Sequence, residues 1–285
     1  MPLLRAPAKI NLTLEVLGRR ADGYHRLRSA VVPISVYDEI TLERNGEAQQ
    51  FRSDAEEIDP QDNLVVKTLR ALELPRNDFS IFLKKRIPIG AGLGGGSSDA
   101  AAVLLAAMSG NFGELGAKDY LSIARGLGSD VPFFLAQTAA IVEGTGERVT
   151  PLGATPPWGC TVLRPPITIS TATAYAELPL LSQARPRASS ATIEVGEALQ
   201  RGDLMRVRAL AHNDFQEWAA RKYPEVQSAL KALEGWSGFA RLTGSGSAVY
   251  TIYADAPRAP LELPPGFERF DAAFVSTPVW RTQSA

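Results

Sequence analysis

The chain contains 285 residues, of which 30 are basic and 31 are acidic, so its formal net charge is −1. Its hydrophobic fraction of 45% and charged fraction of 21% are ordinary for a globular protein and exclude a mainly disordered chain. The near-zero net charge argues against bulk electrostatic binding to nucleic acid or to an anionic membrane. A single cysteine, Cys160, excludes an internal disulfide, and with two histidines it leaves no material for a structural zinc site.

The sequence has no apolar run long enough to cross a membrane, and its N-terminus lacks the apolar core of a signal peptide. We therefore expect a cytoplasmic enzyme with no nucleic-acid or membrane partner. No heptad pattern and no large apolar stripe demand a dimer, so the expected assembly is a monomer or a weak homodimer.

Strand-like and helix-like segments share the first half of the chain. Alternating apolar and β-branched residues predict strands over 27–36, 39–43, 79–84 and 139–143. Apolar periodicity predicts helices over 62–74, 97–108 and 117–127. Asp62 is expected to cap the first of these helices, and Ser97 or Ser98 the second, because these side chains accept hydrogen bonds from free amides.

A proline-rich stretch follows. Five prolines between Pro151 and Pro166 resist a continuous helix or a central strand, so we expect a domain boundary near residue 158. The two expected domains are residues 1–157 and residues 158–285.

The second half is predicted to be mainly helical from about residue 191 to residue 234, with breaks at Gly202 and Pro224. Strands are expected on both sides, over 161–163, 248–253 and 272–275. Because strands are grouped and helices are grouped, the pattern favours an α+β fold over a repeated βαβ sheet.

The most informative segment is residues 88–102, PIGAGLGGGSSDAAA. Its glycines and alanines remove side chains that would keep a ligand away from the backbone. The helix that follows directs free amides and the positive end of its dipole at the loop, which favours a bound phosphate. The hydroxyls of Ser97 and Ser98 are available for phosphate or magnesium. A flexible turn before a helix is the alternative, and it is the weaker one because the loop runs directly into a capped helix.

Other phosphate-binding and nucleophile patterns fit this segment poorly. Gly90, Gly92 and Gly95 satisfy G-x-G-x-x-G, but Pro88 stands where a dinucleotide-binding strand should run into the turn. No lysine follows the glycines, so the Walker pattern is absent. No G-x-S-x-G surrounds the serines, which gives a hydrolase elbow no support.

Three further segments carry candidate functional residues. Residues 6–15, APAKINLTLE, place Lys9 among apolar neighbours, which favours a pocket edge over a solvated surface. Residues 128–134, GSDVPFF, place Asp130 at a predicted helix start, where by itself it is typical of a helix cap. Residues 242–248, LTGSGSA, form a second glycine-rich loop, which by itself is typical of a hairpin turn.

Together and in this order, these segments resemble the GHMP kinases, the small-molecule kinases that include galactokinase, homoserine kinase, mevalonate kinase and phosphomevalonate kinase. The resemblance covers essentially the whole chain. APAKIN at 6–11, ADGYH at 21–25 and the triple glycine of GLGGGSSDAA make it closer to one branch. That branch is the 4-diphosphocytidyl-2-C-methyl-D-erythritol kinases of non-mevalonate isoprenoid biosynthesis.

The resemblance implies a two-domain α+β fold. Its N-terminal domain is expected to be like the second domain of ribosomal protein S5, with a rare left-handed β-α-β crossover. A ferredoxin-like α+β C-terminal domain is expected to close over the substrate. The residues alone favour a right-handed crossover, the usual hand.

The resemblance also implies transfer of the ATP γ-phosphoryl group to the 2-hydroxyl of 4-diphosphocytidyl-2-C-methyl-D-erythritol, with Mg²⁺ bridging phosphate oxygens. Asp130 is then the base and Lys9 its cationic neighbour. The motif assigns no protein ligand to the metal, and Ser98 is the candidate. The second glycine-rich loop contributes Gly244, Ser245 and Gly246. The residues expected to bind ATP are Pro88, Ile89, Gly90, Ala91, Gly92, Leu93, Gly94, Gly95, Gly96, Ser97 and Ser98.

The cytidine end of such a substrate needs aromatic stacking and hydrogen bonds. The resemblance assigns stacking to Tyr24, His25 and Tyr175, the last within the segment STATAY. Thr171 and Asn11 are the expected polar contacts. The alternative for Tyr175 is an ordinary half-buried strand residue.

Three other functions remain open at this point. A kinase for another alcohol, such as homoserine or mevalonate, would have no use for stacked aromatic rings. A dinucleotide-dependent oxidoreductase would bind NAD and would not turn over ATP. A non-catalytic nucleotide-binding module predicts that Lys9 and Asp130 lie far apart.

Overall fold

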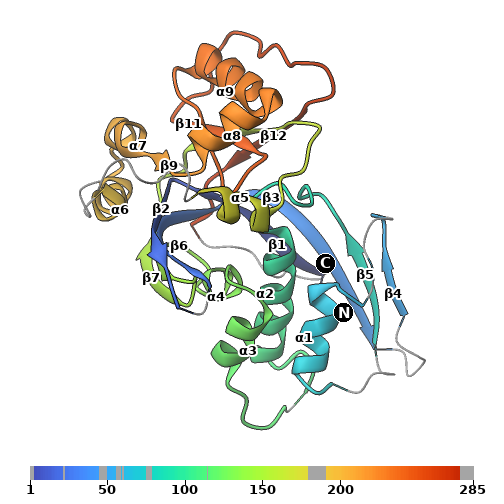
Figure 1. Ribbon diagram of the computed structural model, residues 1–285. Helices are drawn as coiled ribbons and strands as arrows, with labels where there is room; N and C mark the ends of the chain where they lie inside the picture. Colours follow the sequence, from blue (N-terminus) through green and yellow to red (C-terminus); the bar gives the residue numbers. More distant parts are fainter. Residues whose placement is uncertain are drawn as a thin grey trace.

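The computed structural model describes residues 3–21, 23–44, 50–55, 59, 61–74, 79–113, 115–178 and 191–276. Two sheets organise this part of the chain (Figure 1). The first contains β1 (Leu3–Asn11), β2 (Thr13–Arg19), β3 (His25–Arg44), β4 (Gln50–Ser53), β5 (Phe79–Lys84), β6 (Ala139–Gly144), β7 (Arg148–Gly153) and β9 (His212–Asn213). The second is antiparallel, in the order β10 (Arg241–Leu242), β11 (Val249–Tyr253), β8 (Gly159–Arg164) and β12 (Glu268–Ala273).

The helices fall into three groups along the chain. The first group is α1 (Leu64–Ala71), α2 (Gly95–Met108), α3 (Tyr120–Leu127) and α4 (Val131–Leu135). The second is α5 (Thr171–Glu177), α6 (Ala191–Arg201) and α7 (Leu204–Leu210), and the third is α8 (Gln216–Lys222) and α9 (Pro224–Ser237). None of the helices within the described ranges is both long enough and apolar enough to span a membrane.

Strand β3 is the centre of the first sheet. It pairs antiparallel with β1, β2, β5 and β6 along different parts of its length. The two strands predicted over 27–36 and 39–43 are therefore one continuous strand. Strands β4 and β5 run parallel with α1 between them, which makes a β-α-β unit. The hand of that crossover stays a prediction.

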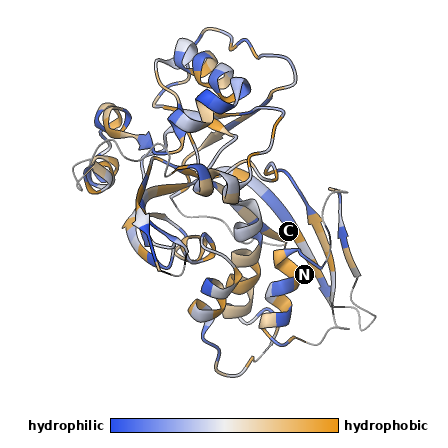
Figure 2. Cartoon of the chain, viewed as in Figure 1, coloured by the Kyte–Doolittle hydropathy of each residue, from blue (hydrophilic) through white to orange (hydrophobic). Residues whose placement is uncertain are grey.

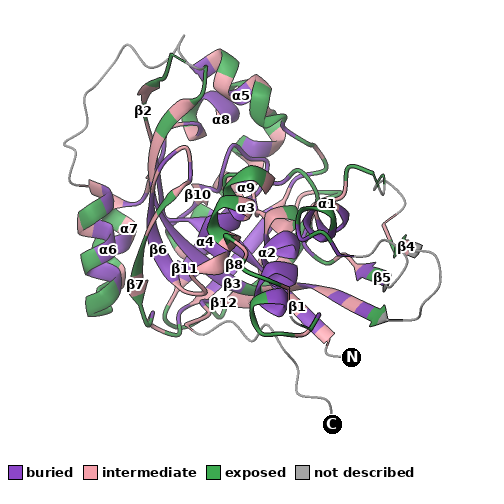
Figure 3. Cartoon of the chain, turned by 90° about the horizontal axis from the view of Figure 1, so that it is seen from below, coloured by how far each residue is buried: buried purple, intermediate pink, exposed green. Residues whose placement is uncertain are grey.

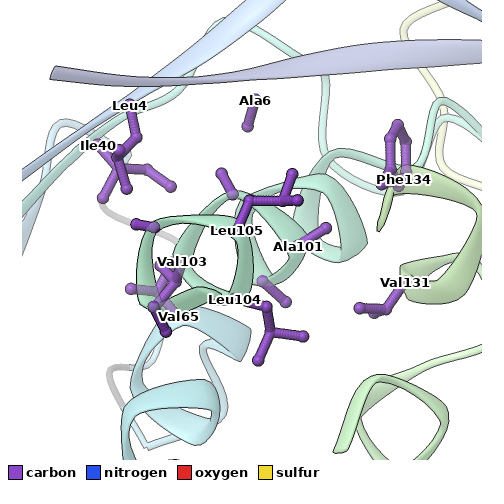
Figure 4. Packing of buried hydrophobic residues seen from close by; sticks show 14 of the residues in the cluster. Leu4, Ala6, Ile40, Val65, Ala101, Val103, Leu104, Leu105, Val131 and Phe134 are labelled. Atoms are coloured by element: carbon purple, nitrogen blue, oxygen red, sulfur yellow. The ribbon is translucent and has the colours of Figure 1, made fainter. Parts of the chain in front are cut away.

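Helices α1 to α4 cover one face of this sheet (Figure 1). Helix α2 is buried along most of its length, because alanines leave room for neighbours on every side (Figure 3). Figure 4 shows Val103, Leu104 and Leu105 of α2 among side chains from the strands and the other helices. This packing holds the N-terminal end of α2, and the loop before it, in a fixed place.

Two predicted helix caps are wrong. Asn63, and not Asp62, caps α1, because its side-chain oxygen accepts a hydrogen bond of 2.8 Å from the amide of Val65. Helix α2 begins at Gly95 after Gly94, whose φ of +73° places it in the left-handed region that glycine adopts at low cost. The serines predicted as caps, Ser97 and Ser98, lie inside the first turn.

Strands β1, β2, β4 and β7 were not predicted from the sequence. The burial of β1 explains why that strand has no recognisable pattern: from Ala6 onward nearly every residue is buried on both faces of the sheet. A strand buried on both faces shows no alternation between apolar and polar residues. Its small residues and Pro7 further weaken the β signal.

Helices α8 and α9 pack on the second sheet with their apolar faces, and Figure 2 shows hydrophilic and hydrophobic residues mixed along α9. The predicted breaks at Gly202 and Pro224 are confirmed by the ends of α6 and the start of α9. A further break at β9 was not predicted. There the backbone pairs parallel with β2, Thr13 opposite His212, so a segment of the C-terminal half joins the first sheet. The α+β prediction is confirmed.

Candidate active site

The phosphate-loop segment, residues 88–97, lines a cavity of about 560 Å³. Strand β5 leads into it and α2 leaves it, so the first amides of α2 have no helical partner and face the loop. Gly90 and Gly92 have φ of +67° and +80°, a backbone conformation that brings amides rather than side chains towards a ligand. This geometry suits an anion held by backbone N–H groups.

Ser98 is the one predicted loop residue that does not line this cavity. It is fully buried, and its hydroxyl has no hydrogen-bond partner within the described part of the chain. Ser97 lines the cavity instead. Helix α2 starts two residues earlier than predicted, so both serines lie within its first turn, where Ser98 is buried and Ser97 lines the cavity.

The two glycine-rich loops touch. The amide of Ala248 donates to the carbonyl of Ala91 at 3.1 Å, and a Cβ atom added to Gly244 would lie 2.9 Å from Cα of Gly92. Gly244 and Ser245 line the cavity, as expected. Gly246 does not, and it packs behind the loop against Ile169 and Leu242.

Lys9 and Asp130 face each other across this cavity. Lys9 Nζ lies 3.7 Å from Asp130 Oδ2, and the side chains are 4% and 39% exposed. Lys9 lies in β1, and its backbone amide donates to the carbonyl of Leu93 in the loop, which fixes its position. Asp130 precedes α4 without a side-chain capping hydrogen bond, so its carboxylate is available to the cavity. The short distance contradicts the prediction made by a non-catalytic nucleotide-binding module.

A second cavity, of about 1010 Å³, adjoins the first. Both are lined by Leu27, Ser129, Thr171 and Tyr175, so these residues mark where they meet. Tyr24 and His25 line the second cavity, and Asn11 lines the first. The predicted site residues, other than Ser98 and Gly246, are thus gathered around two connected spaces.

Aromatic rings stack at the junction. The rings of His25 and Tyr175 are 4.9 Å apart with an interplanar angle of 28°, and Phe215 supports Tyr175 edge-on. Tyr175 belongs to α5, so the alternative of a strand tyrosine is wrong. Burial, with the charge of Asp130 nearby, raises the pKa of Tyr175 to about 12, so its phenol stays protonated. Tyr24, at the rim of the second cavity, is 68% exposed.

Three arginines that sequence reasoning missed also line the second cavity: Arg19, Arg20 and Arg125. Among the described residues that line this cavity there is no carboxylate. The lining of this space therefore combines positive charge with aromatic rings. Arg19 and Arg20 are adjacent in the segment GRRADGYH, and this basic pair could have indicated them in the sequence. Arg125 is brought to the cavity only by the fold.

A buried charge cluster beneath the phosphate loop was missed too. Lys85 Nζ donates to Asp38 and, at 2.8 Å, to Asp99, while Asp38 accepts from the amides of Arg86 and Ile87 at 2.6 and 2.8 Å. Burial alone would lower the pKa of Lys85, but the carboxylates of Asp99 and Asp38 outweigh it and raise that pKa. Burial raises the pKa of Asp99 well above its usual range, and Lys85 offsets only part of this. The cluster ties the end of β5 to the start of α2.

Known proteins resemble this chain in both sequence and structure. The family model for the GHMP kinases N terminal domain matches residues 63–138, and the model for the GHMP kinases C terminal domain matches residues 197–263. Crystal structures of a homoserine kinase from Cytophaga hutchinsonii and of L. major mevalonate kinase have TM-scores of 0.65 and 0.68 at 16% identity. These two similarities show the fold alone.

Nearer relatives are more specific. A 4-diphosphocytidyl-2-C-methyl-D-erythritol kinase of Pseudothermotoga lettingae is 37% identical over 88% of this chain and 91% of that protein. One of Delftia acidovorans is 39% identical over 86% and 84%. A crystal structure of 4-(cytidine 5′-diphospho)-2C-methyl-D-erythritol kinase has a TM-score of 0.78 at 34% identity, covering 96% and 99% of the two chains. This chain therefore belongs to the GHMP kinase family, in the branch of the 4-diphosphocytidyl-2-C-methyl-D-erythritol kinases.

Proposed function

We propose that this protein transfers the γ-phosphoryl group of ATP to the 2-hydroxyl of 4-diphosphocytidyl-2-C-methyl-D-erythritol, giving the 2-phosphate and ADP for non-mevalonate isoprenoid biosynthesis. The observation that carries the proposal is the stacked pair His25–Tyr175, placed where the second cavity opens towards Lys9 and Asp130. A base-binding pocket next to a phosphate loop suits an acceptor alcohol that carries a nucleobase. Homoserine and mevalonate carry none.

Asp130 is the proposed base. Its carboxylate takes the proton of the 2-hydroxyl while that oxygen forms a bond to the γ-phosphorus and the bond from phosphorus to the β-phosphate oxygen breaks. Lys9 Nζ, 3.7 Å from the carboxylate, offsets negative charge on the moving phosphoryl group. Both groups are fixed by β1 and by the start of α4 before substrate arrives, so little reorganisation is needed.

The phosphate loop, residues 88–97, is proposed to hold the triphosphate through backbone amides. The N-terminus of the fourteen-residue helix α2 adds its dipole to those amides. The Asp38–Lys85–Asp99 cluster fixes both sides of the loop from beneath, because Asp38 binds residues that precede the loop and Asp99 lies in the helix that follows it. The loop is therefore preorganised for an anion.

Magnesium fits this site as an ion carried by the nucleotide. Among the described residues no group of three histidine, cysteine, aspartate or glutamate side chains could hold a metal on its own. Mg²⁺ usually keeps waters and is bound through phosphate oxygens with few protein ligands. Ser97 lines the cavity and Ser98 does not, so Ser97 takes the place of Ser98 as the proposed protein ligand of the ion. When bound, the ion would neutralise part of the negative charge of the triphosphate.

The second cavity is proposed to bind the cytidine diphosphate end of the substrate. Tyr175 and His25, with Tyr24 at the rim, provide the surface on which a pyrimidine stacks. Arg19 and Arg125 provide charge for the diphosphate, since guanidinium groups suit phosphate oxygens. Thr171, whose hydroxyl lies 3.0 Å from that of Ser245, is a proposed polar contact at the junction.

The division of the chain into residues 1–157 and 158–285 is part of this proposal. It is supported by the change from β7 in the first sheet to β8 in the second sheet across residues 154–158. A cytoplasmic location and a monomer or weak homodimer complete it.

The test is ADP release from Mg-ATP with four acceptors assayed in parallel: 4-diphosphocytidyl-2-C-methyl-D-erythritol, homoserine, mevalonate and methylerythritol 4-phosphate. Turnover confined to the first acceptor is expected. Turnover with another alcohol would keep the phosphate loop and the Lys9–Asp130 pair but remove the cytidine pocket. Folded protein that binds ATP and releases no ADP with any acceptor would overturn the kinase proposal.

A further inference from the structure

The side chain of Asn11 lies at a meeting point of both halves of the chain. It is 5% exposed and has polar partners from three segments. Its Oδ1 accepts from Lys9 Nζ at 2.6 Å and from the amide of Gly244 at 2.9 Å, and its Nδ2 donates to Ser29 Oγ at 2.8 Å. One carboxamide thus connects the catalytic lysine, strand β3 and the second glycine-rich loop.

The hydrogen bonds allow one orientation of this carboxamide. The Lys9 ammonium and the Gly244 amide are both donors, so the atom that faces them must be oxygen. On the other side, Ser29 Oγ uses its own proton on the carbonyl of Thr13, so it accepts from Asn11 Nδ2. A flipped amide would place N–H groups against two donors, and the network excludes it.

Asn11 is the nearest polar partner of the Lys9 ammonium. The distance from Nζ to Asn11 Oδ1 is 2.6 Å, a hydrogen bond, whereas the 3.7 Å to Asp130 Oδ2 is an ion pair without one. A lysine ammonium has three donors on a flexible stem of four carbons. With one donor fixed on Asn11, the other two remain for Asp130 and for phosphoryl oxygens.

Thr243 connects the Asn11 side chain to the second glycine-rich loop. Its hydroxyl accepts from the amide of Asn11 at 3.1 Å, and its own proton has two acceptors in reach, Asn11 Oδ1 at 3.2 Å and the carbonyl of Gly92 at 3.4 Å. Thr243 is fully buried and does not line the cavity, so its hydroxyl lies behind the surface that a ligand would touch. The direct route from this hydroxyl to the Lys9 ammonium runs through Asn11 Oδ1, whereas its longer contact with Gly92 leads to the backbone of the phosphate loop.

We infer that Asn11 is a positioning residue for the Lys9 ammonium, and that the second glycine-rich loop, through Thr243 and Gly244, sets the position of that ammonium by holding Asn11. The inference rests on the proposed function. Asn11 then has two roles. One is the expected contact with substrate, and the other is to link the C-terminal half of the chain to the catalytic pair. The rate of phosphoryl transfer then depends on a loop that need not touch the reacting atoms.

The first test is Thr243→Val, which keeps the shape of the side chain and removes the hydroxyl. We expect kcat to fall by between about tenfold and about a hundredfold, the range for small misplacements of a reacting group. KM for ATP and for the cytidine-bearing acceptor should each stay within about twofold, because bound ligands keep their contacts. Thr243→Ser, which restores the hydroxyl, should recover most of kcat.

A matched control is Thr251→Val. Thr251 is also a fully buried threonine of the C-terminal half, and its hydroxyl bonds to Ser237, away from the cavities. Loss of stability by itself would act on both variants alike, so thermal melts of the two should shift by similar amounts. Only Thr243→Val should lower kcat.

A double-mutant cycle tests whether the loop acts through Asn11. In the Asn11→Ala background, the added Thr243→Val change should lower kcat by less than about twofold, because the connecting carboxamide is already gone. Independent, multiplicative effects on kcat would overturn the inference, as would a Thr243→Val variant in which only KM changes. Wild-type turnover of the cytidine-bearing acceptor is measured in the same series, so failure of the proposed function would be seen separately.

Discussion

The backbone oxygen of Thr243 lies 2.3 Å from the position that a Cβ atom on Gly92 would occupy. The two glycine-rich loops, 151 residues apart in sequence, therefore pack through backbone atoms with no room for a side chain between them. Gly92 also has a φ of +80°, which residues with a Cβ rarely adopt. For both reasons, substitution of Gly92 by any residue with a Cβ atom should disturb the contact between the loops.

Gly92→Ala should separate the loops and distort the phosphate site. The left-handed backbone alone costs an alanine about 1–2 kcal/mol, and the contact with Thr243 requires the backbone to move as well. We expect KM for ATP to rise at least about tenfold, with a lower melting temperature. The control is Gly235→Ala in α9, where a Cβ meets nothing within 4 Å; that change should stabilise the protein by about 0.5–1 kcal/mol. Unchanged ATP kinetics in Gly92→Ala would contradict the proposed role of the contact.

Asp130→Asn should abolish most turnover and spare ATP binding. The amide keeps the shape of the side chain but cannot take the proton of the acceptor hydroxyl, a contribution of about 10²–10⁴ in rate. ADP release measures the first effect and calorimetric titration with Mg-ATP the second. Because Asp130 makes no side-chain capping bond and Lys9 keeps its hydrogen bond to Asn11, the melting temperature should change little. Near-normal turnover would remove Asp130 as the base.

The sequence was sufficient to predict features whose signal is local. A glycine-rich loop that runs into an alanine-rich helix can be recognised as an anion site from the sequence, and Lys9 is conspicuous among apolar neighbours. The pairing of Lys9 with Asp130 needed the resemblance to a family, because 121 residues separate the two side chains that lie 3.7 Å apart. Ser98 was misplaced by the position of a helix start, which depends on the left-handed turn at Gly94.

Features that depend on distant segments could not be predicted. Asp38, Lys85 and Asp99 come from β3, the end of β5 and α2, and no spacing in the chain marks them as partners. Each of these three residues taken singly is typical of a solvated surface charge. The fold alone makes them a buried cluster, in the same way that it brings Arg125 to the cavity of Tyr24 and His25.

Tyr175→Ala should weaken binding of the cytidine-bearing acceptor without affecting ATP. Loss of a stacked ring removes about 0.5–1.5 kcal/mol, so KM for the acceptor should rise by between about twofold and about tenfold. Tyr175→Phe keeps the ring and should keep KM nearly unchanged, since the phenol stays protonated and neutral across the working pH range. A larger effect of Tyr175→Phe than of Tyr175→Ala would point to the hydroxyl rather than to stacking.

Arg125→Glu should raise KM for the acceptor in a salt-dependent manner. The arginine lies in the last turn of α3 and lines the second cavity, where the diphosphate is proposed to bind. Exposed charges are screened over about 10 Å at 0.1 M salt, so the ratio of KM between variant and wild type should shrink as salt is added. Arg201→Glu, at the exposed end of α6, is the control and should leave KM unchanged. A ratio that does not vary with salt would argue against a charge effect.

Asp99→Asn should change how stability depends on pH. Burial raises the pKa of Asp99 well above its usual range, so the folded protein binds this proton more tightly than the unfolded chain does. A raised folded-state pKa contributes stability that is fully present below the ordinary aspartate pKa of about 3.9 and is lost as pH rises above it. The asparagine cannot titrate, and Lys85 keeps its bond to Asp38 in the variant. The melting temperature of the wild type minus that of Asp99→Asn, measured from about pH 4 to pH 8, should therefore fall as pH rises. A difference that grew with pH would mean that Lys85 outweighs burial and holds Asp99 charged.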